Sequence, residues 1–216
     1  MRHTAHVDEL VERARRLAAG PRRGILGVCG PPGVGKSTFA RALVDRLGAD
    51  AVVVPMDGFH LHDDVLAALG RLQRKGAPDT FDVDGFRALL ERLREGGDRP
   101  VYAPAFDRER EVSLAGAIPV LAEHRLVVTE GNYLLLDTPE WRGVRACLDE
   151  CWFLTADDEV RRRRLVDRHV RHGRPWEAAQ AWVEATDEPN ARLVGKHRVR
   201  ADLVIDHADL PAWMAG

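Results

Sequence analysis

Short runs of apolar residues alternate along the chain with longer segments in which apolar residues recur every three or four positions. The short runs are continuous, which is typical of strands buried on both faces of a parallel sheet. The longer segments are typical of helices that cover such a sheet with one face. Strands are therefore predicted at residues 24–29, 51–55, 126–129, 151–154 and 203–205, and helices at 7–18, 36–47, 84–94 and from about 157.

These elements together predict an α/β fold with a five-stranded, mainly parallel sheet flanked by helices. His172-Gly-Arg-Pro175 is expected to divide the late helical region in two. Residues 71–82 and 103–117 show no periodicity and contain Gly, Pro and charged residues, so they are expected to be loops on the substrate side. Because no repeat or linker interrupts the pattern, residues 1–216 are expected to form a single domain.

The strongest chemical signal is Gly30-Pro-Pro-Gly33-Val-Gly35-Lys36-Ser37, a full match to the phosphate-binding loop G-x-x-x-x-G-K-[ST]. It lies between a predicted strand and a predicted helix, where backbone N–H groups can surround a β-phosphate. Lys36 is expected to reach the β- and γ-phosphates, and the Ser37 hydroxyl is expected to bind Mg²⁺. The predicted nucleotide-binding residues here are Gly30, Pro31, Pro32, Gly33, Val34, Gly35, Lys36, Ser37 and Thr38.

Other nucleotide-binding classes fit less well. The Asn-Lys-x-Asp motif with which GTPases bind guanine does not occur, and neither does the Ser- and Gly-rich signature of transport ATPases. A dinucleotide-binding turn is disfavoured because Thr38 stands where that motif requires its third glycine. The length of the chain and its other motifs favour a small-molecule kinase.

Four further motifs follow the predicted strands or lie between them: Pro55-Met-Asp57-Gly58-Phe59-His60, Phe81-Asp82-Val-Asp84-Gly-Phe86, Pro104-Ala-Phe106-Asp107 and Thr129-Glu130-Gly131-Asn132. With the phosphate loop, and in order from about residue 22 to 206, they resemble the uridine kinase, phosphoribulokinase and type I pantothenate kinase family. The pattern most resembles bacterial members labelled nucleoside/nucleotide kinase-like or sugar kinase-like. The resemblance implies a P-loop kinase fold and transfer of the γ-phosphoryl group of ATP, with Mg²⁺, to a hydroxyl of a sugar, nucleoside or pantothenate-like acceptor.

Asp57 follows a predicted buried strand, the position where α/β sheets place ligand-binding groups. A carboxylate there can accept the proton of an attacking hydroxyl, and the resemblance implies that Asp57 is this general base. The alternative is that Asp57 caps a helix at residues 61–69. Glu130 ends the third strand, and the resemblance places it near Mg²⁺ together with Ser37, in keeping with the oxygen ligands that this ion prefers.

Arginines crowd the region from 161 to about 178, which is expected to form a helical lid. An arginine on a lid can stabilise charge on the transferring phosphoryl group. The resemblance places such arginines at Arg164 and Arg168, and it assigns Arg168 and Arg174 to the nucleotide. The preceding Arg161, Arg162 and Arg163 are expected to form a solvated basic face. The predicted catalytic residues are therefore Asp57, Lys36, Arg164 and Arg168.

The acceptor site is expected to use carboxylates and aromatic rings, because each carboxylate can accept two hydroxyl hydrogens of a polyhydroxylated ligand. The uridine kinases carry a histidine shortly after their aromatic–Asp pair, whereas this chain has Arg108-Glu-Arg-Glu-Val112 there. That departure disfavours uridine and cytidine, and Arg108 and Arg110 leave room for an anionic or sugar-like acceptor. The predicted acceptor residues are Asp57, Phe59, Asp82, Asp84, Tyr102, Phe106, Asp107 and His60, the last being equally open to an ordinary packing role.

Composition narrows the partners and the compartment. A formal net charge of -2 over 216 residues argues against broad binding to nucleic acid or acidic membranes. No apolar run approaches about 18 residues, so no membrane span is predicted. Three cysteines without metal-binding spacing are expected to be buried reduced thiols, which indicates a cytoplasmic protein. A regulatory module that binds a nucleotide and hydrolyses it slowly is the alternative function, although it would need neither Asp57 nor the lid arginines.

Overall fold

Five parallel strands form the central sheet of the computed structural model, which describes residues 7–210. The order is β2–β5–β1–β6–β7, with every neighbouring pair parallel. The predicted α/β fold is therefore confirmed, while both ends of the predicted domain, residues 1 and 216, lie outside the described range. The strands are β1 (Gly24–Cys29), β2 (Ala51–Pro55), β5 (Leu126–Gly131), β6 (Glu150–Thr155) and β7 (Leu203–Asp206).

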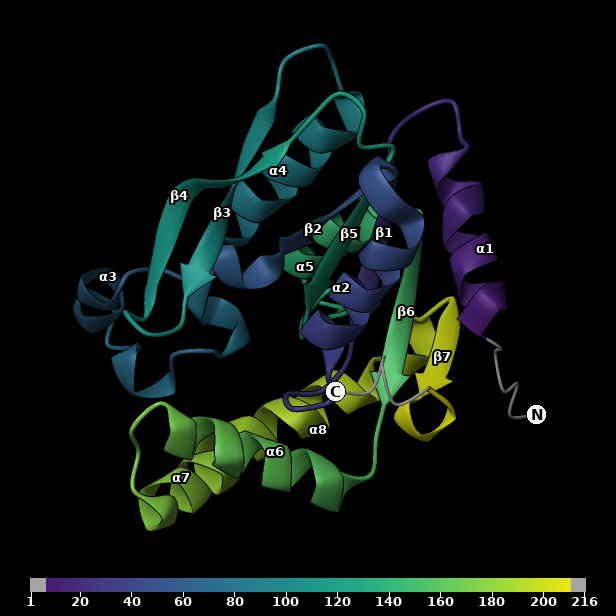
Figure 1. Cartoon of the computed structure of the whole chain (residues 1–216). Coiled ribbons are helices and arrows are strands. Elements are labelled where there is room, and N and C mark those ends of the chain that lie inside the picture. Colours follow the sequence, from purple (N-terminus) through teal and green to yellow (C-terminus); the bar gives the residue numbers. More distant parts are fainter. Residues whose placement is uncertain (1–6, 211–216) are drawn as a thin grey trace.

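Helices cover both faces of this sheet, as the continuous apolar strands require (Figure 1). In β1, the side chains of Leu26 and Val28 pack with one pair of helices, and those of Ile25 and Cys29 belong to the core on the other face. All six positions of β1 are buried for this reason. The first face carries α1 (Val7–Ala18) and α2 (Lys36–Leu47), and the second carries α4 (Val83–Glu95) and α5 (Pro139–Ala146).

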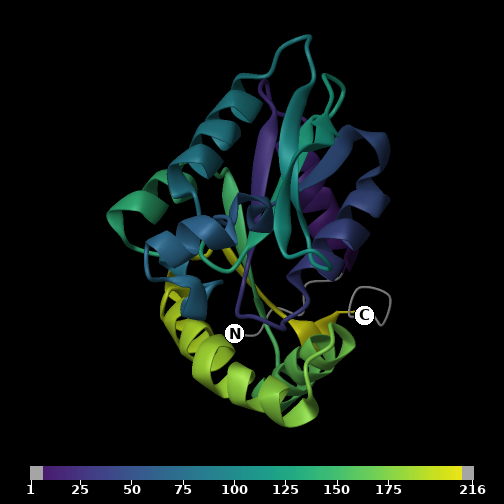
Figure 2. The same cartoon turned by 90° about the vertical axis from the view of Figure 1, so that its left-hand side faces the viewer.

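The prediction of a loop at residues 103–117 is wrong. This region forms an antiparallel hairpin of β3 (Val101–Asp107) and β4 (Val112–Val120), which lies beside the main sheet (Figure 2). Val101 and Ala103 enter the core while Tyr102 between them is 58% exposed, which is the alternation of a strand. The register shifts between Ala103 and Ala105, so the alternation does not continue along the sequence and the pattern was hidden.

Three late helices lie across the carboxyl ends of the strands, at the bottom of Figure 1, and the first of them is rich in arginine. The start predicted for the first of them is confirmed, and its capping residue is Asp157, whose side chain accepts hydrogen bonds from two backbone N–H groups. The predicted break at residues 172–175 is also confirmed, with Gly173 at a φ of 91°. These helices are α6 (Asp158–Arg171), α7 (Trp176–Trp182) and, after a π-helical turn, α8 (Glu188–Lys196).

Residues 71–82 are irregular as predicted, apart from two short 3₁₀ turns at Leu72–Arg74 and Pro78–Thr80. The short helix α3 (Asp63–Ala68) precedes them. Cys29, Cys147 and Cys151 are all buried and free, as the sequence predicted. Within residues 7–210, the structure contains no helix with the length and apolar character needed to cross a membrane.

Candidate active site

The phosphate loop joins β1 to α2, in the strand–loop–helix context that its sequence predicted. Gly33 has a φ of +79°, and a Cβ there would lie 2.7 Å from the carbonyl oxygen of Arg161. A side chain at this position would therefore collide with α6 as well as strain the backbone. Glycine is needed both for the curl of the loop and for the seating of α6 against it.

Lys36, the first residue of α2, is buried and folded over its own loop. Burial lowers the pKa of Lys36, while the negative charges of Glu130 and Asp57 act in the opposite direction. The ammonium group is thus held at the mouth of the loop, where the phosphates of a nucleotide would replace its present partners. Its Nζ atom donates hydrogen bonds to the carbonyl oxygens of Gly30 (3.0 Å) and Pro31 (3.1 Å) and to Oδ1 of Asn132 (2.6 Å).

The residues predicted to hold the metal face each other. The hydroxyl of Ser37 donates a hydrogen bond of 2.7 Å to the carboxylate of Glu130, which is buried at the end of β5. Burial raises the pKa of Glu130, and the neighbouring charge of Asp57 raises it further. No group of three or more His, Cys, Asp or Glu side chains among the described residues is placed to hold a metal. Two protein oxygens fit Mg²⁺ that takes its other ligands from phosphates and water.

Asp57 lies in a 3₁₀ turn, Met56–Phe59, directly after β2. The alternative that it caps the next helix is wrong, because the N-cap of α3 is His62. Its Oδ2 instead accepts a hydrogen bond of 2.6 Å from Nη2 of Arg108 at the hairpin tip. Burial acts to raise the pKa of Asp57, but the positive charges of Arg108 and Lys36 help to bring it below its ordinary value. The side chain of Asp57 is therefore a carboxylate at neutral pH, and it is close enough to Lys36 for the two charges to interact.

His60 forms an aromatic wall next to Asp57. Its ring lies 4.1 Å from that of Phe81 and 4.6 Å from that of Phe106, measured between centroids. Nδ1 of His60 lies 2.8 Å from the backbone oxygen of Asp57, and since a carbonyl oxygen only accepts, the ring donates this hydrogen bond. Burial lowers the pKa of His60. Phe59 points instead toward the core, with its ring 5.1 Å from that of Phe86.

The other predicted acceptor residues have contacts of their own. Asp82 caps the start of α4, and the side chain of Asp84 is 81% exposed. Tyr102 faces solvent, and Asp107 accepts hydrogen bonds from two backbone N–H groups of the hairpin tip. The structure therefore places His60 and Phe106 beside Asp57, but it gives Asp82 and Asp107 local structural roles.

Two of the three predicted lid arginines approach the phosphate loop. Nη1 of Arg164 lies 3.0 Å from Nε2 of His207, and it would be 4.0 Å from a Cβ at Gly35. Arg168 is largely enclosed, and burial followed by the positive charge of Arg108 lowers its pKa. Arg174 lies away from this group, with its guanidinium 3.8 Å above the ring centre of Trp182.

Arg161 corrects the prediction of a solvated basic face. Its side chain is 1% exposed and forms an ion pair with Glu188 of α8, whereas Arg162 and Arg163 are exposed as predicted. Nη1 of Arg161 donates a hydrogen bond of 3.2 Å to the carbonyl oxygen of Pro32 in the phosphate loop. An acidic residue three positions earlier, Asp158, also pairs with Arg161 and was the only local signal of its role.

Asn132 is a second residue whose role was missed, although the motif that contains it was recognised. The sequence shows an amide two residues after Glu130, just beyond the end of β5. Its contact with Lys36 depends on β5 lying next to β1, which no local pattern reveals.

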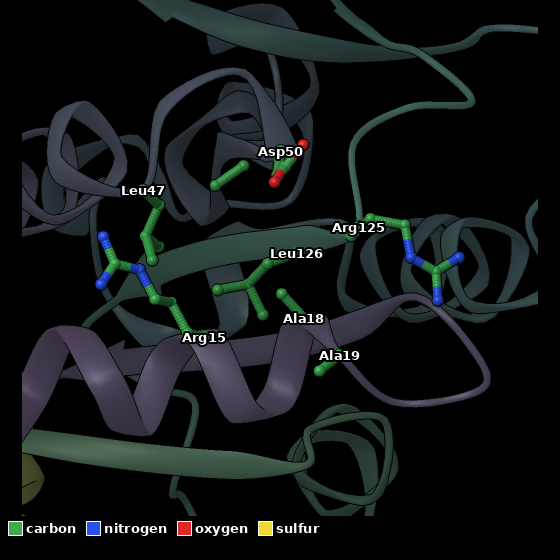
Figure 3. A pocket seen from close by; sticks show the side chains of 8 residues that line it. Arg15, Ala18, Ala19, Leu47, Asp50, Arg125 and Leu126 are labelled. Carbon is green, nitrogen blue, oxygen red and sulfur yellow. The ribbon is translucent and has the colours of Figure 1, made fainter.

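A pocket at the opposite edge of the sheet contains none of the predicted residues (Figure 3). It lies where β2 and β5 begin, between the end of α1 and the end of α2. Its two arginines already have partners, since Arg15 pairs with Glu12 and Arg125 donates to the backbone oxygen of Gly20. The lining residues are Arg15, Ala18, Ala19, Leu47, Asp50, Ala51, Arg125 and Leu126.

Comparisons with known proteins agree with this site. The model of the phosphoribulokinase/uridine kinase family matches residues 25–210. A candidate uridine kinase of Schizosaccharomyces pombe, C227.14, is 34% identical over 94% of this chain and 91% of its own length. The ATP-dependent kinase-like protein notR' of Aspergillus versicolor is 37% identical over 67% of this chain and 89% of its own.

A solved structure described as a candidate fructose transport system kinase, from Silicibacter sp. TM1040, is 39% identical and superimposes with a TM-score of 0.83. The match covers 94% of this chain and 98% of that one. Both the family match and the fold agree with a phosphate loop between β1 and α2. The chain therefore belongs to the phosphoribulokinase/uridine kinase family and is a P-loop kinase that phosphorylates a hydroxyl group of a small molecule.

Proposed function

We propose that this protein transfers the γ-phosphoryl group of ATP to a hydroxyl of a small polyhydroxylated metabolite, with Asp57 as the general base and Mg²⁺ as cofactor. The observation that carries the proposal is the position of Asp57 in the turn directly after β2, whose last residue pairs with Glu130, the hydrogen-bond partner of Ser37 in the phosphate loop. The charges of Asp57 and Lys36 are close enough for each to shift the pKa of the other. A module that only bound a nucleotide would need Lys36 but not this carboxylate.

The nucleotide would occupy the loop and draw Lys36 away from Asn132 and the two carbonyl oxygens. Ser37 and Glu130 would hold Mg²⁺, which when bound neutralises charge on the phosphates. In this proposal residues 161–178 act as the lid, and Arg164 and Arg168 stabilise the charge that develops on the transferring group. Arg174 would contact the nucleotide after leaving the ring of Trp182.

The acceptor would lie between Asp57 and the aromatic wall of His60 and Phe106. Its hydroxyl oxygen forms a bond to the γ-phosphorus while the hydroxyl proton passes to the Asp57 carboxylate. The bond from the γ-phosphorus to the bridging oxygen breaks, and ADP leaves. Since the pKa of Asp57 lies below its ordinary value, the base is ionised at neutral pH. Its contribution to the rate comes from its position more than from its basicity.

The test is the Asp57→Asn variant, assayed for ADP release at saturating Mg-ATP with nucleosides, pantothenate, pentoses, hexoses and their phosphates. Turnover should fall by about 10²–10⁴, the usual contribution of a positioned base. Asp98→Asn is the matched control, because Asp98 is exposed between α4 and β3 and its change should have little effect. Nucleotide binding should survive in both variants, since Asn has the shape of Asp.

Near-parental turnover of Asp57→Asn with a confirmed acceptor would remove Asp57 from the mechanism. Lys36→Ala separates this from the assignment of the nucleotide site, because it removes the charge on the β- and γ-phosphates. Equal turnover of Lys36→Ala and the parent would contradict that assignment.

A further inference from the structure

The candidate base is engaged by an arginine from another element. Oδ2 of Asp57 accepts the 2.6 Å hydrogen bond of Arg108, although the two residues are 51 positions apart in the chain. A guanidinium paired with a carboxylate stabilises its ionised form and so weakens it as a proton acceptor. In the structure, the pairing with Arg108 therefore makes Asp57 a weaker proton acceptor.

The hairpin presents Arg108 at this place by several contacts. Asp107 folds the tip into a turn by accepting the N–H groups of Glu109 (2.9 Å) and Arg110 (3.0 Å). Lys75 holds the other end of the tip by donating to the backbone oxygen of Glu111 (2.9 Å). Arg108 is thus positioned by its surroundings, while its own side chain is 43% exposed and has room to move.

Positive charge exceeds negative charge around Asp57. Lys36, Arg108 and Arg168 lie close enough to lower its pKa, and Glu130 is an acidic neighbour whose own pKa is raised by the charge of Asp57. Arg168 is itself disfavoured by Arg108, since the two guanidinium groups repel each other. The γ-phosphate of a nucleotide would pair with Lys36 and the lid arginines. If Arg108 releases Asp57, it therefore needs a different anion as its partner.

We propose that Arg108 is a positioning residue that restrains Asp57 until an anionic group of the acceptor takes Arg108 over. The inference rests on the proposed role of Asp57 as base. Only an anion can replace the carboxylate that the guanidinium gives up, because a neutral hydroxyl offers no compensating charge. The acceptor is therefore a hydroxyl compound that also carries a phosphate or a carboxylate.

The consequence is that ATP is protected when the acceptor is absent. Hydrolysis would require water to attack the γ-phosphorus, pass a proton to Asp57 and release ADP and phosphate. With Arg108 paired to Asp57, this proton transfer is disfavoured. The anionic acceptor thus serves as the signal that makes Asp57 available.

The first test measures ADP release without acceptor, at saturating Mg-ATP, for the parent and for Arg108→Gln. The variant should hydrolyse ATP about three- to tenfold faster, because the freed carboxylate is a stronger base. Arg99→Gln is the control, since Arg99 is exposed just before β3, away from the tip, and it should behave as the parent. In the double variant Asp57→Asn/Arg108→Gln the increase should vanish.

The second test compares matched probes: ribose with ribose 5-phosphate, and glycerol with glycerate. The parent should prefer the anionic member of at least one pair, and the pair that responds distinguishes phosphate from carboxylate. Arg108→Gln should raise KM for that member by at least about tenfold, the loss of one charge-assisted hydrogen bond, while leaving kcat for the neutral probe unchanged or higher. Arg99→Gln should retain the preference.

An unchanged rate of acceptor-free hydrolysis in Arg108→Gln would overturn the proposal, as would an increase that persists in the double variant. Retained preference for the anionic probe in Arg108→Gln would overturn it too. A thermal unfolding midpoint matching that of the parent confirms that the variant is folded. These outcomes differ from failure of the proposed function, which shows as parental phosphoryl transfer by Asp57→Asn alone.

Discussion

At the scale of single residues, the site holds buried charges whose natural partners arrive with the substrates. Burial raises the pKa of Glu130 and lowers that of Lys36, so each charged form is disfavoured where it stands. The hydrogen bonds to Ser37 and Asn132 offset only part of this cost. Such residues are placed for binding phosphate and metal at the expense of stability.

Glu130→Gln should therefore separate stability from activity. A carboxyl whose pKa is raised in the folded state binds its proton more tightly there than in the unfolded chain. The stability that it contributes falls as pH rises above its ordinary value of 4.5. At pH 7.5 the unfolding midpoint of the variant should equal or exceed that of the parent. Between pH 5 and 7.5 the midpoint of the variant should decrease less than that of the parent.

Phosphoryl transfer by Glu130→Gln should nevertheless fall by at least about 10- to 100-fold, since losing even a residue that only orients a metal ligand has that effect. Thermal unfolding across pH and ADP release measure the two effects, with the exposed Glu95→Gln as control. A lower midpoint at pH 7.5 together with full activity would contradict this account of Glu130.

The residues most readily found from sequence were those whose partners are local. The phosphate loop was recognised because all its functional groups lie within eight positions and its conformation is set by its own glycines. The partners of Asp57 and Arg161 were missed because Arg108 and Glu188 are 51 and 27 residues away. Such pairs exist only once the elements have packed.

At the scale of elements, the main feature is the joint between the phosphate loop, α6 and α8. Arg161 of α6 bonds to the loop at Pro32 and pairs with Glu188 of α8, while the glycine at position 33 lets the backbone of α6 come close. One buried guanidinium thus fastens three segments. The arrangement fixes the base of the arginine-rich helix and leaves Arg168, two turns further along, nearer the acceptor side.

Arg161→Ala should destabilise the protein strongly. Arg161→Ala takes the buried countercharge from the carboxylate of Glu188, which keeps the exposed Arg162 as a partner, and breaking a buried ion pair costs up to about 3–5 kcal/mol. The neighbouring Arg163→Ala, at an exposed position, should change the free energy of unfolding by no more than about 0.5 kcal/mol. Urea denaturation at pH 7.5 measures both, and equal values would mean that the joint is not fastened by this side chain.

The elements differed in how clearly the sequence revealed them. The five strands of the main sheet were found because burial on both faces makes them continuous apolar runs. The hairpin β3–β4 was missed because its outer positions are exposed and Pro104 stands at the shift in register. The irregular stretch of Gly, Pro and charges that indicates a loop is here a bulged strand.

At the scale of the whole molecule, the carboxyl edge of the sheet gathers the parts of the site from distant segments. The phosphate loop follows β1, Asp57 follows β2, and Glu130 is near the end of β5; these three strands are neighbours in the sheet although far apart in sequence. The arginine-rich helices close one side and the hairpin tip the other (Figure 1). The fold class and the position of the site at the carboxyl edge of the sheet were predictable from the sequence. The late helices and the hairpin tip, which close the site on its two sides, were predictable only in part.

Mg-ATP should stabilise the whole fold, because a ligand that binds only the native state adds its binding free energy to the stability. At a concentration 100 times Kd the gain is about 2.7 kcal/mol, which corresponds to a midpoint roughly 5–10 °C higher for a chain of this size. Lys36→Ala should show a much smaller shift. Differential scanning fluorimetry with and without Mg-ATP measures this, and equal shifts in both proteins would place the nucleotide elsewhere.

The packing of the β3–β4 hairpin against the turn that carries Asp57 has a consequence for how the choice of acceptor can be altered. At Gly58 a Cβ would lie 2.5 Å from the backbone oxygen of Pro104, so the hairpin fits against the turn that carries Asp57 only while position 58 is glycine. Its base is anchored in the core through Val101 and Val120, whereas its tip is held by polar contacts alone. With the proposed role of Arg108, substitutions confined to the tip would change the choice of acceptor and leave the phosphate loop with its own contacts intact.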